Sequence, residues 1–219
     1  MNGSVKSMPV GDLFGKIRLL FWGFLLPTLL LMIGILTAPI YLRYSGIWKK
    51  AEVLVVEIND QSSAKQWKSI GNLYKKEIFS QLWIILPWEK TLEKRILESS
   101  DPLESIKANL LPYAIPEDKI KILKMEESEP HSTYFISKSL IKNLVNNEIK
   151  SLLIFCDEYE SNRVLSTYRK NLAPIGIEVT VYPAKSEWET GNWFMKEQGV
   201  RRISEELFLY VYYKIRGYQ

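Results

Sequence analysis

The chain has 219 residues, a formal net charge of +4, one cysteine and one histidine. A single cysteine excludes an intramolecular disulfide and a cysteine-based zinc cluster. The small net charge, with acidic and basic residues interspersed, disfavours nucleic-acid binding. The length leaves room for one soluble domain of ordinary size beside a membrane segment.

The N-terminal part predicts a membrane anchor. No charged residue occurs from Leu19 to Leu42, and Arg18 and Arg43 bracket this run. About 20 apolar residues cross a bilayer as a helix, whereas the apolar region of a cleaved signal peptide is only about 7 to 15 residues long. We therefore predict an N-terminal tail (1–16), a transmembrane anchor (17–44), a linker (45–50) and a soluble domain (51–219). The flanking basic residues balance, so charge leaves the orientation open.

Strand-like and helix-like segments alternate through the first part of the soluble domain. Apolar and β-branched runs predict strands, apolar residues at helical spacing predict helices, and Pro or Gly marks several ends. In chain order we expect a strand at 52–58, a helix around 67–78, a strand at 82–86, one or two helical segments within 90–112, a strand at 120–125 and a helix at 131–147. The inward residues expected for this last helix are Tyr134, Leu140, Ile141, Leu144 and Val145.

The clearest unit runs from Ile149 to Pro183. An apolar run at 152–156, a helical pattern from Val164 to Leu172 and a second strand at 177–182 predict a strand, a helix and a parallel strand. A final helix over 199–215 is expected to place five residues on one face: Val200, Ile203, Leu207, Tyr210 and Val211. The soluble domain is therefore predicted to be α/β, a doubly wound, mainly parallel sheet of about five strands in a Rossmann-like three-layer sandwich.

Ligands of open parallel sheets bind outside the carboxyl ends of the strands, and this rule selects the candidate site. Carboxylates there can act as general acid and base or bind a divalent cation, and an arginine can bind a phosphate or carboxylate in a fork. The competing interpretation is that these are solvated loop and helix-capping residues. We assign no metal site and no cofactor. The five ligand-binding candidates are Glu57, Asp60, Thr133, Glu160 and Arg163.

Two further residues have alternative interpretations. His131 precedes a predicted helix start, where it could contact an anion or act as a base, although a lone histidine there is more often a surface residue. Cys156 at the end of an apolar strand is most simply a small core residue. The sequence contains no nucleophile elbow, Walker loop, dinucleotide fingerprint or metalloprotease helix.

Several phrases, taken together in their order and spacing, resemble the YdcF/SanA/ElyC-like family of bacterial envelope-associated α/β proteins. They are the opening strand Ala51–Glu57, the turn Ala114–Ile120, Thr133-Tyr134, Arg163 with Thr167–Leu172, and the tail with Asn192-Trp193-Phe194, Gly199 and Glu206 through Tyr213. The resemblance implies a membrane-anchored protein of the cell envelope whose soluble domain lies outside the cytoplasm. It also implies a small-molecule or envelope-precursor site around Arg163 and Glu160.

The chain departs from the family pattern at four places, including Ile58-Asn59 where a Gly-Trp pair is usual and Leu209 where a lysine is usual, and the other two bear directly on a site. Family members usually carry a histidine three residues before the aligned arginine, where this chain has Glu160, and a glycine-rich end of the second strand, where it has Leu86–Glu89. Glycines at strand ends let a ligand approach the backbone. The alternative to a binding protein is therefore a non-catalytic relative that acts as a structural or interaction module for a membrane partner.

Overall fold

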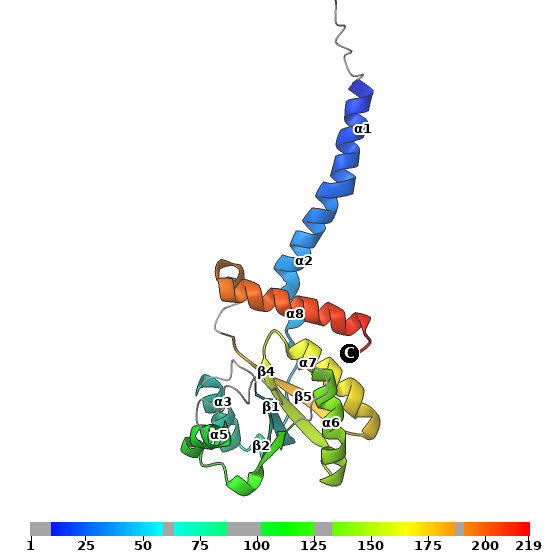
Figure 1. Cartoon of the computed structure of the whole chain (residues 1–219). Helices are drawn as coiled ribbons and strands as arrows, with labels where there is room; N and C mark the ends of the chain where they lie inside the picture. Colours follow the sequence, from blue (N-terminus) through cyan, green and yellow to red (C-terminus); the bar gives the residue numbers. More distant parts are fainter. Residues whose placement is uncertain (1–9, 59–63, 87–101, 125–132, 187–190) are drawn as a thin grey trace, which may run out of the picture. The chain divides into compact units, whose positions relative to one another are not determined.

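The computed structural model describes residues 10–58, 64–86, 102–124, 133–186 and 191–219 (Figure 1). Two residues considered above, Asp60 and His131, lie outside the described residues, as does the predicted helical stretch 90–101. The chain divides into two compact units, Met1–Ile40 and Tyr41–Gln219.

The first unit is helical. Its described elements are α1 (Val10–Leu20), the π-helical turn η1 (Phe21–Leu25) and α2 (Leu26–Leu42), which ends in the second unit. Within it, the stretch Phe14–Leu42 forms a helix of 29 residues that is long and apolar enough to cross a membrane. This confirms the prediction of one N-terminal helix of transmembrane type.

The π-helical turn ends two residues before Pro27, and this proline explains its position. Proline has no N–H to donate, and its ring clashes with the carbonyl four residues earlier, here that of Gly23 inside the turn. The wider turn bonds the Leu26 N–H to the Phe21 carbonyl instead, as π-bulges do. The Thr28 hydroxyl donates to another carbonyl of this turn, that of Phe24, at 2.8 Å.

The second unit contains a five-stranded sheet in which every described pairing is parallel. Its order is β3-β2-β1-β4-β5. The strands are β1 (Ala51–Glu57), β2 (Phe79–Leu86), β3 (Ile120–Lys124), β4 (Ser151–Asp157) and β5 (Glu178–Ala184). The α/β prediction is confirmed.

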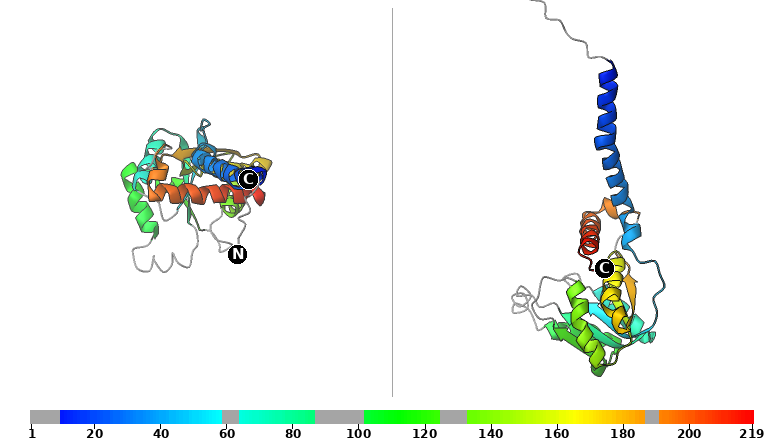
Figure 2. Two further views of the ribbon diagram at one scale, coloured as in Figure 1. Left: turned by 90° about the horizontal axis from the view of Figure 1, so that it is seen from above. Right: turned by 90° about the vertical axis from the view of Figure 1, so that its right-hand side faces the viewer.

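Helices cover both faces of this sheet, as the two orientations of Figure 2 also show. Two pack on one face, α3 (Ala64–Lys75) and α5 (Pro102–Leu110), and two on the other, α6 (Thr133–Asn146) and α7 (Ser161–Leu172). The last helix is α8 (Glu197–Ile215). The short 3₁₀ turns are Leu111–Tyr113, Glu117–Lys119, Ala173–Ile175 and Trp193–Met195.

Strand β1 shows why interior parallel strands have continuous apolar sequences. Val53 and Val55 pack with α6 and α7, whereas Leu54 and Val56 pack with α3 and α5, and all four are fully buried. A strand with helices on both faces needs apolar residues at successive positions. Cys156 lies against the first of these clusters, half-buried, and burial raises the pKa of its thiol well above the ordinary value.

Two helix faces differ from their predictions. In α6, Val145 is 58% exposed, and the buried face includes the hydroxyl residues Thr133 and Ser137. In α8, Val200 and Val211 are exposed, while the buried positions are Gly199, Ile203, Glu206 and Tyr213. The predicted inner faces were partly wrong, because they were chosen from apolar residues alone. Polar side chains occupy part of the inner face of both α6 and α8.

Candidate functional site

The site predicted at the strand carboxyl ends lies at the switch point of the sheet. From β1 the chain proceeds outward through β2 and β3, and then places β4 on the other side of β1. The segments that follow β1 and β4 therefore leave in opposite directions, which opens a crevice in doubly wound sheets. Glu57 ends β1 and Asp157 ends β4, so acidic groups flank this point.

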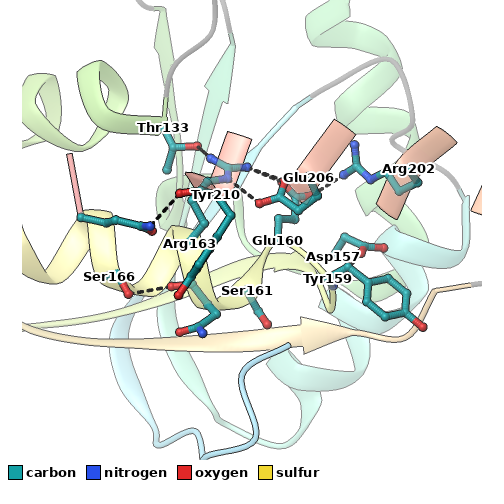
Figure 3. Close-up of polar contacts among 12 residues, drawn as sticks. Thr133, Asp157, Tyr159, Glu160, Ser161, Arg163, Ser166, Arg202, Glu206 and Tyr210 are labelled. Carbon is teal, nitrogen blue, oxygen red and sulfur yellow. Dashed lines mark hydrogen bonds and ion pairs between the residues drawn. The ribbon is translucent and has the colours of Figure 1, made fainter. Parts of the chain in front are cut away.

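The buried residue Arg163 lies beside this switch point (Figure 3). Arg163 lies in the first turn of α7 and is 4% exposed. Its guanidinium binds the Glu206 carboxylate of α8 through two hydrogen bonds, from Nε to Oε1 at 2.5 Å and from Nη2 to Oε2 at 2.9 Å. Nη1 donates to the hydroxyl of Thr133, the first residue of α6, at 3.0 Å. The ring of Tyr213 lies 4.9 Å from its central carbon. One side chain thus connects three helices.

Burial shifts the pKa values of Arg163 and Glu206 in opposite directions. Burial alone would lower the pKa of Arg163, but Glu206 and Glu160 outweigh it, and the pKa of Arg163 lies above its ordinary value. Burial raises the pKa of Glu206 to about 6, against the opposing effect of Arg163. Both groups are therefore ionised at neutral pH. A fork that could bind a ligand anion is already filled by a carboxylate of the chain.

Glu160 connects this buried pair to the surface. Its Oε2 accepts from Arg163 Nη2 at 3.5 Å, and its Oε1 accepts from Arg202 Nη2 of α8 at 2.6 Å. The Glu160 and Arg202 side chains remain 18% and 19% exposed. The buried Arg163 and the partly exposed Arg202 thus each hold one carboxylate oxygen of Glu160.

Glu57 is the second notable carboxyl. Its Oε1 accepts a hydrogen bond of 2.6 Å from the hydroxyl of Tyr168, which is fully buried in α7. Burial raises the pKa of Glu57 to about 7, Tyr168 lowers it, Glu160 raises it and Arg163 lowers it. The pKa of Glu57 therefore lies near neutral pH, and Glu57 shares an electrostatic environment with Glu160 and Arg163.

The loop after β4 is built on side-chain oxygens. Asp157 accepts from the Tyr159 N–H at 2.9 Å and from the Ser186 hydroxyl at 2.5 Å. Burial raises the pKa of Asp157 above its ordinary value. The next residue, Glu158, accepts from the Ser186 N–H at 3.0 Å and pairs with Arg43 at 3.2 Å. These bonds hold the loop that carries Glu160.

One buried polar atom near Arg163 has no hydrogen-bond partner in the part of the chain that the structure describes. This atom is the hydroxyl oxygen of Thr167, one turn after Arg163 on α7. A buried hydroxyl without a partner is destabilising unless a bound molecule satisfies it. Within the described ranges, no group of three or more His, Cys, Asp or Glu residues is placed to hold a metal ion.

The structure brings most of the predicted candidates together. Thr133 and Glu160 both bond to Arg163, Glu57 interacts electrostatically with Glu160 and Arg163, and Asp60 lies outside the described residues. The sequence had suggested an arginine fork open to a ligand, whereas Glu206 fills it.

Sequence reasoning missed three partners, Tyr168, Arg202 and Glu206. Tyr168 was assigned only to the core of α7, although its hydroxyl needs a partner when buried. Glu206 had one usable signal, because it lies three residues after the buried Ile203 and so on the same face of α8. A carboxylate on an inward helix face implies a buried cation elsewhere.

Comparison of the chain with protein-family models and with curated proteins found no match. The geometry described above is therefore what assigns the candidate site.

Proposed function

We propose that the chain is a membrane-anchored protein of the cell envelope, of the YdcF/SanA/ElyC-like kind, whose soluble domain binds a small molecule at the switch point between β1 and β4. The observation that carries the proposal is that Glu160, in the loop after β4, bonds to the buried Arg163, while Glu57, at the end of β1, lies within electrostatic reach of both. Buried ion pairs that hold partly exposed carboxyls in place are typical of pre-organised sites.

The accessible groups indicate the chemistry of the ligand. Glu57, Asp157 and Glu160 are partly exposed and offer acceptor oxygens, and Arg202 is the partly exposed cation beside them. Because Glu206 fills the fork of Arg163, this arginine positions Glu160 rather than contacting the ligand. A ligand with hydroxyl or amino donors, such as the sugar part of an envelope precursor, fits this set better than a phosphate, which the carboxylates would repel.

Glu57 suggests the reaction to test for. A carboxyl with a pKa of about 7 serves as general acid or base at neutral pH. Its bond to Tyr168 fixes its orientation. An acid–base step on a bound hydroxyl or amine is therefore the reaction class that this site supports.

A second candidate function is favoured by a different observation. The closed fork of Arg163 holds α8 in place, and α8 exposes apolar side chains to the outside. This arrangement suits a non-catalytic interaction module beside a membrane. It predicts that no small molecule binds at the switch point.

Ligand-observed NMR with the full chain in detergent micelles distinguishes the two functions. Monosaccharides, amino sugars and small amines are compared with nucleotides and inorganic phosphate. We expect binding by a donor-rich ligand, its loss in Glu57→Gln, and normal binding in Glu178→Gln, which alters a carboxyl at the opposite end of the sheet. Absence of binding by all classes to a folded sample would favour the interaction module.

A further inference from the structure

Helix α8 carries a row of exposed apolar side chains in its second half. Phe208, Val211, Tyr212 and Ile215 are 77%, 47%, 49% and 79% exposed. Their spacing of three and four residues places them on one side of the helix, away from the buried Ile203, Glu206 and Tyr213. Single exposed apolar residues are normal, but four on one face form a patch. We call these four residues the outer patch.

The helix cannot turn the outer patch inward, because its opposite face is fixed. Glu206 is held by Arg163 and Arg202 by Glu160. Near the C-terminus, the ring of Tyr218 stacks on Tyr134 of α6 at 4.1 Å between centroids. The Lys170 ammonium of α7 also donates to the Gly217 carbonyl. Both ends of the helix are thus tied to the domain.

The charged residues in the second half of α8 and in the tail after it are all basic. From Leu207 to Gln219 the chain contains no acidic residue, and Lys214 and Arg216 give this segment two positive charges. The Lys214 ammonium lies over the Tyr210 ring, 5.2 Å from its centroid. Apolar and aromatic residues on one face with flanking cations are typical of helices that lie in the headgroup region of a bilayer with anionic lipids.

Residues 41–44, which belong to the second unit, are bonded to the segment 158–163 of that unit. The Tyr44 N–H donates to the Ser161 hydroxyl, the Asn162 side chain donates to the Tyr41 carbonyl, both at 2.8 Å, and Arg43 pairs with Glu158. The α8 contacts Glu160 and Arg163 belong to this same segment, residues 158–163. Residues 41–44 and α8 are therefore bonded to the same short segment of the second unit.

We propose that the outer patch of α8 lies in the headgroup region of the membrane that the N-terminal helix crosses, with Lys214 and Arg216 against anionic lipid headgroups. The apolar helix ends at Leu42, and residues 41–44 are bonded to the segment that also holds α8, so only a few residues of chain separate that segment from the helix end. The inference rests on the N-terminal helix crossing a membrane, and it is independent of the ligand site.

The test places a nitroxide on α8 of the full chain in vesicles of phosphatidylcholine and phosphatidylglycerol. Phe208→Cys and Ile215→Cys are labelled separately in a Cys156→Ala background, and accessibility to oxygen is compared with accessibility to a water-soluble nickel complex. Val145→Cys on α6 is the control, because Val145 is an exposed apolar residue of the same domain outside α8. We expect oxygen to dominate at both α8 positions and the nickel complex at position 145.

Two results would overturn the proposal. Water-like accessibility at both α8 positions, equal to that of the control, would show that the outer patch is not in lipid. Spin–spin broadening that grows with the protein-to-lipid ratio would show that a second copy of the chain covers it. The labelled positions are well exposed, so the substitutions leave the core intact, and circular dichroism checks this.

Discussion

At the scale of single residues, Glu57 links the sheet to the chemistry of the site. It ends an interior strand, and one oxygen of its partly exposed carboxyl accepts from a buried tyrosine hydroxyl. Burial therefore favours its neutral form. The consequence is a proton-exchanging group at the place where an α/β sheet binds its ligands.

The raised pKa of Glu57 predicts a specific pH dependence of stability. The native state keeps a proton between the ordinary value of 4.5 and about 7, where the unfolded chain has lost it. The free energy of unfolding should thus fall as the pH rises through this window and stay level above it. The full shift corresponds to roughly 3 kcal/mol.

Glu57→Gln isolates this effect, because an amide oxygen can still accept from Tyr168 but carries no charge. We expect the variant to exceed the wild type in stability above about pH 7, by up to roughly 3 kcal/mol, with the gap closing toward pH 4.5. Urea unfolding of the full chain in micelles at several pH values measures the difference. Curves that stay parallel over the whole range would contradict the raised pKa.

Two threonines near Arg163 form a matched pair for mutation. The Thr133 hydroxyl accepts a hydrogen bond from the guanidinium, whereas the Thr167 hydroxyl is buried with no partner in the described part of the chain. Thr133→Val should lower the free energy of unfolding by about 1.5 to 3 kcal/mol, because it removes a bond to a charged group. Thr167→Val should be neutral or stabilising. Equal losses in both variants would contradict this view of the site.

At the scale of elements, the ion pair of Arg163 and Glu206 determines where α8 lies. It is the buried connection from α8 to α7, and through Thr133 it reaches α6. We expect Arg163→Ala and Glu206→Ala each to cost roughly 3 to 5 kcal/mol, because each leaves a buried charge without its partner. The double variant should lose clearly less than the sum.

The exposed pair Arg201 and Glu205, on the same helix, is the control for this cycle. Replacing Arg201 should change stability little, because solvent screens exposed pairs. Strict additivity of the two buried substitutions, measured by the same unfolding experiment, would mean that the charges do not act as a unit.

Gly199 near the start of α8 tests how closely the helix approaches the preceding turn. A Cβ at this position would lie 2.3 Å from the Trp193 carbonyl oxygen, a backbone atom that cannot rotate away. Gly199→Ala should therefore destabilise the protein by about 1 to 3 kcal/mol. Gly191→Ala is the control, since no atom of the described residues lies within 4 Å of its added Cβ. Equal melting temperatures for the two variants would contradict this packing.

At the scale of the whole molecule, local sequence patterns predicted most of the architecture. The apolar runs of β1 and β4 and the length of the N-terminal apolar stretch follow from burial in a sheet and in a bilayer. These features depend on residues that are neighbours in the sequence. The α/β class and the transmembrane type of the first helix could therefore be predicted.

The site could be predicted only in part, for the same reason. Glu160 and Arg163 are three residues apart on one helical turn, so their proximity was visible in the sequence. Glu206 is 43 residues from Arg163, and Tyr168 is 111 residues from Glu57. Periodicity predicts a helix and its face, but not the element on which that face packs. Only the tertiary structure reveals these long-range partners.

The most direct test of the proposed binding function is the affinity of a donor-rich ligand as a function of pH. Because ionised Glu57 is the acceptor, affinity should rise about tenfold per pH unit below about 7 and level off above it. The same titration with Glu57→Gln should give weak binding without this pH dependence. An affinity independent of pH and unchanged in Glu57→Gln, or no binding at any pH, would contradict a ligand site at the β1 and β4 switch point.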